Sequence, residues 1–214
     1  MFQNMHFVQQ NNFVSDLLLS AALGFFYFQM GKFPIQTIFT SAFRSFFGWL
    51  AISAFVGGFG HLLSFHVGVW LKVVSWFFVV GALFQLEFGL ISAAHWSRRW
   101  LVFSKIKAVL TLAALVFTQD FMWIKVNSTV GIVGLVVPIL FFFYRKTREP
   151  ALILIIVGLL FNGVSGAIHA MHIDFSKWFD STDLSHFVST ICFTFVFIAL
   201  RKIAHSFAFN MAKT

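Results

Sequence analysis

The sequence has few charged residues, three prolines and one cysteine. Charged side chains occupy 10% of the 214 positions, whereas an ordinary soluble domain has roughly 25%. A soluble fold of this length has too small an interior to hide a composition that is 59% hydrophobic, so the sequence excludes a soluble domain. The single cysteine, Cys192, excludes an internal disulfide, and we expect it to pack as a small apolar residue within a helix.

Long apolar runs take the place of the missing polar surface. A membrane-spanning helix needs about 20 mostly apolar residues. The runs that meet this requirement are 14–30, 40–64, 68–93, 106–124, 129–144, 150–173 and 183–201. We therefore predict an all-α, polytopic seven-helix bundle, a single transmembrane domain over residues 1–214, with the lipid bilayer as its partner. Only the short link from Lys125 to Ser128 separates the fourth run from the fifth, and its Asn and Ser suit a turn.

Lysine and arginine are distributed unevenly between the predicted spans. The N-terminal tail and the second link have none, the fourth link has Lys125 alone, and the sixth has Lys177 beside two aspartates, whereas the third and fifth links and the C-terminal tail are basic. By the positive-inside rule, this alternation places the N-terminus outside and the C-terminus in the cytoplasm. It also accounts for the net charge of +8 without a nucleic-acid partner. The small size and the lack of a cleavable signal peptide favour a bacterial inner membrane.

Ionisable side chains inside a bilayer are costly, so each is a candidate for function. In the predicted topology, His61, His169 and His186 lie within roughly 5–8 Å of the outer boundary, at the depth of Asp16 and Asp183. Three imidazoles from three helices suit a catalytic zinc site, which has three protein ligands and an open water position. We predict that these histidines bind zinc, and that Asp16 or Asp183 acts as the base or orients a ligand.

Structural roles compete with catalytic ones at the acidic positions. Asp16 follows Ser15 and Asp183 follows Thr182, which are positions typical of helix N-caps. Glu87, in the third span, suits a hydrogen bond to a neighbouring serine within the bundle or a place in a proton relay.

The other histidines are expected to lie away from the chemistry. His66 and His172 are expected in water at the interface, and His95 and His205 among basic residues that set orientation. Gly58 and Gly166 each precede a candidate histidine by about one turn, where a small residue lets another helix approach closely. No predicted span carries a lysine at its centre, which argues against a retinal Schiff base.

Seven spans with histidine and aspartate at the helix ends resemble the superfamily of alkaline ceramidases, progestin–adiponectin receptors and haemolysin-III-like proteins. The resemblance covers the architecture of the whole chain. In that superfamily a serine precedes a histidine by one turn on an early helix, and an HxxxH pair lies on the last helix. His61 matches the early histidine, with Gly57 at the serine position, and His186 matches one member of the pair, with Thr190 at the other.

The resemblance implies a metal-dependent membrane hydrolase that cleaves a lipid amide or ester near the outer leaflet. His169 would then supply the third zinc ligand. Asp16, Asp120 or Asp183 would replace the aspartate that the third span lacks. Two other readings stay open: a seven-helix transporter or sensor that uses the same side chains for protons or ions, and a haem-binding redox subunit.

Overall fold

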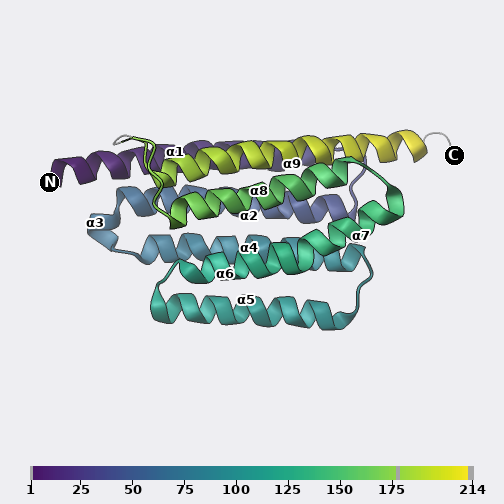
Figure 1. Ribbon diagram of the computed structural model, residues 1–214, viewed down its shortest axis with the longest axis horizontal. Coiled ribbons are helices and arrows are strands. Elements are labelled where there is room, and N and C mark those ends of the chain that lie inside the picture. The colour runs from purple at the N-terminus through teal and green to yellow at the C-terminus, as the bar shows by residue number, and fades with distance from the viewer. Residues whose placement is uncertain (1, 177–178, 212–214) are drawn as a thin grey trace.

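The computed structural model describes residues 2–176 and 179–211, and this part of the chain is helical with short connections (Figure 1). Lys177 and Lys213, which enter the charge count, lie outside the described residues. The elements in chain order are α1 (Phe2–Met30), α2 (Ile38–Leu62), α3 (Ser64–Val67), α4 (Trp70–Ala93), α5 (Arg98–Thr118), α6 (Met122–Gly131), a π-helical turn η1 (Ile132–Val136), α7 (Val137–Thr147), α8 (Ala151–Ala170) and α9 (Ser181–Met211).

Seven stretches of these helices are long and apolar enough to cross a membrane, which confirms the predicted number of spans. They are Gln10–Met30, Ile38–Leu62, Trp70–Ala93, Arg98–Thr118, Met122–Thr147, Ala151–Ala170 and Ser181–His205. The chain ends lie at opposite ends of the bundle, as an odd number of spans requires (Figure 1). Which end faces the cytoplasm stays a prediction.

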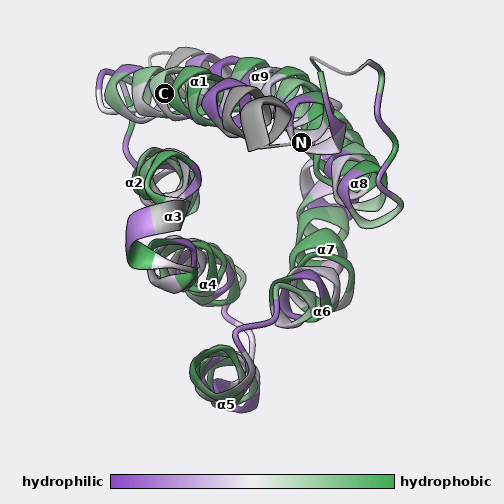
Figure 2. Ribbon diagram, turned by 90° about the vertical axis from the view of Figure 1, so that its left-hand side faces the viewer, coloured by the Kyte–Doolittle hydropathy of each residue, from purple (hydrophilic) through white to green (hydrophobic). Residues whose placement is uncertain are grey.

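We name the two ends of the bundle by their residues. The histidine end is where α2 and α8 finish and α9 begins, near His61, His169 and His186. The basic end is where α4 and α7 finish, near Arg98 and Arg145. Viewed along its length, the bundle is an open ring formed by α1, α2, α4, α6 with α7, α8 and α9, and α5 lies outside this ring (Figure 2). α5 packs on α4 and α6.

Small polar side chains join neighbouring helices of the ring. Ser20 of α1 donates a hydrogen bond to the carbonyl of Ala51 in α2 at 2.8 Å. Ser53 of α2 donates to the carbonyl of Ser75 in α4 at 2.9 Å. Such contacts replace the hydrophobic driving force, which is weak between helices that are already in lipid. Cys192 is buried within α9, as predicted.

The fourth and fifth spans differ from the prediction. α5 begins at Arg98 rather than at 106, and the link to α6 lies at Gln119–Phe121 rather than at Lys125–Ser128. Gln119 adopts a left-handed conformation with φ 50°, which ends α5. The side chain of Asp120 then accepts a hydrogen bond from the backbone N–H of Met122 at 2.8 Å, at the start of α6. Asn127, expected in a turn, is buried within α6.

These boundaries place Lys107 near the middle of α5, so the prediction that no span has a central lysine is wrong. Its ammonium forms an ion pair with Glu87 of α4 at 2.8 Å and donates to the side-chain oxygen of Asn127 in α6 at 2.6 Å. Glu87 also accepts a hydrogen bond from Ser104 of α5, so the expected bond to a serine within the bundle is confirmed. Polar residues that pair with one another across helices do not interrupt those helices.

Candidate active site

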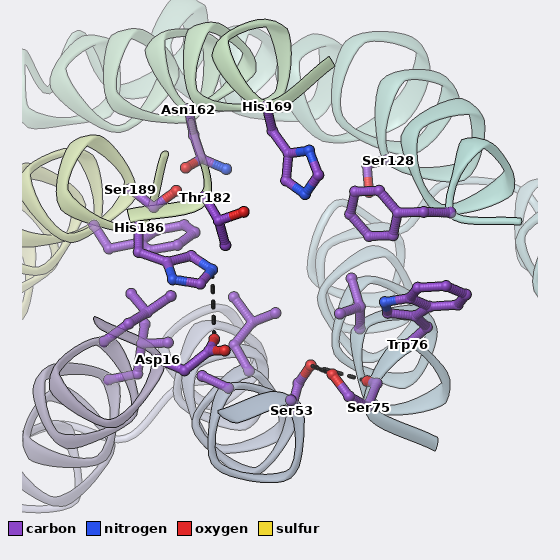
Figure 3. A pocket seen from close by; sticks show the side chains of 18 of the residues that line it. Asp16, Ser53, Ser75, Trp76, Ser128, Asn162, His169, Thr182, His186 and Ser189 are labelled. Atoms are coloured by element: carbon purple, nitrogen blue, oxygen red, sulfur yellow. Dashed lines mark hydrogen bonds and ion pairs between the residues drawn. The ribbon is translucent and has the colours of Figure 1, made fainter. Parts of the chain in front are cut away.

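A cavity of about 480 Å³ lies inside the ring and reaches from the histidine end into the bundle. Its polar side chains come from six helices, and they include Asp16, His61, His169 and His186 (Figure 3 labels three of these four). Apolar side chains line the deeper part. The structure therefore brings four of the five predicted site residues to one cavity, and Asp183 does not line it.

Asp16 is the centre of a polar cluster, which it forms with His61 and His186. It is 5% exposed on α1. One carboxylate oxygen lies 3.4 Å from Nε2 of His186, and the other lies 3.8 Å from Nε2 of His61. The dashed line between Asp16 and His186 in Figure 3 marks the shorter contact. Two imidazoles from α2 and α9 thus converge on one carboxylate from α1.

Two glycines of α2 allow neighbouring helices to approach closely, α1 at Gly58 and α4 at Gly57. A Cβ atom on Gly58 would lie 3.1 Å from the Cβ of Asp16, and one on Gly57 would lie 3.0 Å from the hydroxyl oxygen of Ser75. A larger residue at either position would press on a neighbouring helix. The expected close approach is therefore confirmed for Gly58. It is wrong for Gly166, where a Cβ would meet no atom within 4 Å.

Ser15 fixes the orientation of His186. Its hydroxyl oxygen lies 3.0 Å from Nδ1 of His186 and donates to the backbone carbonyl of Asn12 at 3.1 Å. The Ser15–Nδ1 contact forms with either tautomer of His186, because Nδ1 either donates to the hydroxyl oxygen or accepts from it. Nε2 then faces the Asp16 carboxylate. In one tautomer Nε2 donates its own hydrogen to that carboxylate, and in the other a proton or another cation is needed between the two lone pairs.

His169 lies on the wall of the cavity opposite Asp16 (Figure 3). Its ring stacks on Phe121 with 5.2 Å between centroids. Its Nδ1 is buried without a hydrogen-bond partner, and so is the side-chain oxygen of Asn162 in the same helix. Both side chains line the cavity, so each of these two atoms can accept a hydrogen bond from a ligand or, at His169, bind a metal ion.

The donor atoms of this cavity are of the types that bind zinc, but they do not surround one point. Among the described residues, no three His, Cys, Asp or Glu side chains form a group that could hold a metal ion. His61 and His186 are nearest to such a group, through Asp16, while His169 stands across the cavity. Three imidazoles with one carboxylate are a donor set typical of catalytic zinc. Zinc binding stays a prediction.

Neither candidate aspartate caps a helix. Asp16 lies within α1, far from its first turn. At the start of α9, Asp180 is the cap, because its side chain accepts the backbone N–H groups of Thr182 at 2.8 Å and Asp183 at 3.0 Å. Asp183 is 3% exposed, and one of its oxygens has no hydrogen-bond partner. The interpretation of Asp16 and Asp183 as helix N-caps is therefore wrong.

The other titratable residues fall outside the cluster or were missed. His66, His95, His172 and His205 are exposed, as expected for residues in water near the helix ends. Lys72 also lines the cavity, and it was not identified from the sequence as a site residue. The sequence feature that could have identified Lys72 is its spacing from Trp76, Val79 and Leu83. This spacing places all four residues on one face of α4.

Comparison with known proteins gives a family and no further relative. No curated protein and no solved structure matches the chain. One family model, described as a family of unknown function (DUF6962), matches residues 12–205. The match includes Asp16, His61, His169 and His186. Because it spans most of the sequence, the chain belongs to this DUF6962 family.

Proposed function

We propose that the protein is a membrane-embedded hydrolase that cleaves an amide or ester bond of a lipid in the cavity at the histidine end. The observation that carries this proposal is the convergence of His61 and His186 on the buried carboxylate of Asp16, at the polar part of a cavity with an apolar floor. Such a cluster can accept, hold and return a proton.

The shape and lining of the cavity suit an amphiphile. Its volume of about 480 Å³ lies in the range of small-molecule sites. Leu23 is seven residues beyond Asp16 on α1, so it lies about 10 Å deeper, and Leu83, Phe46 and Phe193 join it on the lining. An acyl chain would lie against these side chains while its carbonyl stays near the polar cluster.

The chain's own residues supply the proton transfers of a hydrolysis. Asp16 accepts a proton from a water molecule as the water oxygen bonds to the carbonyl carbon. Asp16 then passes this proton to His186 or His61, which gives it to the departing amine or alcohol as the carbon–nitrogen or carbon–oxygen bond breaks. Ser15 holds the His186 ring in place during this exchange. The products are a fatty acid and an amine or alcohol.

Zinc fits this scheme by donor chemistry. His61, His169 and His186 would hold the ion. Nδ1 of His169 has no hydrogen-bond partner, so it could coordinate the ion without breaking an existing bond. Zinc in such a site acts as a Lewis acid and makes water a stronger acid near neutral pH. Asp16 would then orient the ligands and accept the proton.

A transporter that uses the same residues for protons is the rival. It requires a polar path from the cavity to the basic end. Buried apolar side chains occupy that direction, including Leu86, Leu135 and Ile139, which are at most 1% exposed. This closed floor favours a substrate pocket over a conduit.

The experiment is to purify the protein in neutral detergent and measure fatty-acid release from long-chain N-acyl amides and the matching esters, together with bound metal. We expect hydrolysis by the wild type and a loss of at least a hundredfold for Asp16→Asn, His61→Ala and His186→Ala. His205→Ala is the matched control, because His205 is exposed at the other end of α9. Absence of hydrolysis by metal-loaded, folded protein across both series would refute the proposal.

A further inference from the structure

Lys72 places an ammonium group at the same cavity, beside the polar cluster. It lies near the start of α4, at the histidine end, and it lines the cavity together with Asp16 and His61. Its stem packs over Gly60, where a Cβ would lie 3.1 Å from Cγ of Lys72. The lysine is therefore held against α2.

The described residues leave the Lys72 ammonium without a direct counter-ion. No carboxylate in this part of the chain lies within 4 Å of it, whereas the Lys107 ammonium pairs with Glu87 at 2.8 Å. Among the described residues, Asp16 is the only carboxylate that lines the cavity, and its two oxygens face His61 and His186. Partial burial of the ammonium costs hydration free energy, which the more distant charge of Asp16 offsets only in part. A bound anion would offset this cost.

An apolar stripe on α4 extends from Lys72 into the bundle. Trp76, Val79 and Leu83 follow it at helical spacing, and all line the same cavity. From Lys72 to Leu83 the stripe runs about 16 Å along the helix. A ligand lying on it would meet a positive charge at one end and apolar side chains along its length.

We propose that Lys72 binds the anionic headgroup of the lipid, so that the cavity selects amphiphiles that carry a phosphate or a carboxylate near the polar end. This inference rests on the proposed function in one respect, that a lipid occupies the cavity. The ammonium contacts the anion, and the stripe on α4 contacts the acyl chain of the lipid. Asp16 keeps its proposed role as the proton acceptor at the bond that is cleaved. A lysine that only extends toward water at the interface would make no such distinction between headgroups.

The test measures binding rather than hydrolysis, so that it can succeed even if the enzyme proposal fails. Dissociation constants of dodecyl phosphate, dodecanol and inorganic phosphate are measured by calorimetry in neutral detergent. We expect the wild type to bind dodecyl phosphate about tenfold to a hundredfold more tightly than dodecanol, since a hydrogen bond to a charged group contributes about 1.5–3 kcal/mol. Lys72→Gln should remove this preference, and Lys72→Arg should retain it. Lys202→Gln is the matched control, because Lys202 is exposed near the basic end.

Each outcome has a defined meaning. Equal binding of dodecyl phosphate and dodecanol by the wild type, or an unchanged preference in Lys72→Gln, overturns the proposal. Inorganic phosphate that binds as tightly as dodecyl phosphate identifies a soluble anion and overturns the lipid assignment. If Lys72→Gln does not fold, an amine-reactive reagent is used on the wild type instead. Dodecyl phosphate, but not dodecanol, should then protect Lys72 from modification, and equal protection by both contradicts the proposal.

Discussion

Replacing Lys107 by methionine should destabilise the bundle far more than an ordinary surface substitution. Glu87 is fully buried and has two partners, the ammonium of Lys107 and the hydroxyl of Ser104. Methionine fills much of the volume of the lysine stem but leaves the Glu87 carboxylate without its counter-ion. Removing one partner of a buried ion pair costs about 3–5 kcal/mol.

The reciprocal change, Glu87→Gln, should cost less, because Lys107 keeps a partner. Its ammonium still donates to the side-chain oxygen of Asn127 at 2.6 Å. The double variant Glu87→Gln with Lys107→Met removes both charges, and it should be more stable than Lys107→Met alone. This order distinguishes a desolvated ion pair from a simple loss of packing.

The assay is reversible unfolding of the purified variants in mixed micelles, followed by circular dichroism. Lys146→Met is the matched control, since Lys146 is exposed at the basic end of α7, and we expect a change within about 0.5 kcal/mol. If Lys107→Met also lies within that range, then Glu87 and Lys107 are not a desolvated pair and the reasoning is wrong. A double variant less stable than Lys107→Met would equally contradict it.

Three further predictions concern topology and the site. A reporter fused to the C-terminus should be cytoplasmic and one inserted in the Gln119–Phe121 loop should be on the opposite side; the reverse result would invalidate the charge argument. Asp16→Asn should keep the unfolding midpoint within a few degrees while lipid hydrolysis falls, because this residue caps no helix; unchanged hydrolysis would remove Asp16 from the chemistry. Gly58→Val should lower stability by about 1–3 kcal/mol and impair hydrolysis together, because it pushes α1 away, whereas Gly24→Ala, with no atom within 4 Å of the new Cβ, should leave both unchanged.

Hydropathy predicted the number of spans because each span must supply about 20 apolar residues whatever its neighbours are. It misplaced the ends of α5 and α6 because it set the boundaries beside Lys105, Lys125 and Asn127, which all lie inside helices. Lys107 and Asn127 satisfy each other across the helix interface, so they lie inside the bundle instead of in water. That pairing depends on which faces of α5 and α6 meet, and a single sequence does not specify the rotation of one helix against another.

The same limit applies to the candidate site, but only in part. The depth of His61, His169 and His186 followed from their positions along the spans, and the cavity contains all three. Their mutual distances did not follow. His169 stacks on Phe121, a residue of the α5–α6 link, and this contact holds its ring on the far wall. Because that link was predicted in the wrong place, the sequence offered no reason to expect the separation.

Asp16 shows how a boundary decides the interpretation of a residue. If a helix began at Ser15, an aspartate beside it would be explained by its bonds to backbone N–H groups. α1 instead begins at Phe2, so those N–H groups are already paired within the helix, and the carboxylate needs other partners. The partners within reach are His61 and His186, and the Ser15 hydroxyl positions the second of them. A buried carboxylate that caps no helix and lies between two imidazoles fits the role proposed for it, in which it takes up a proton and returns it.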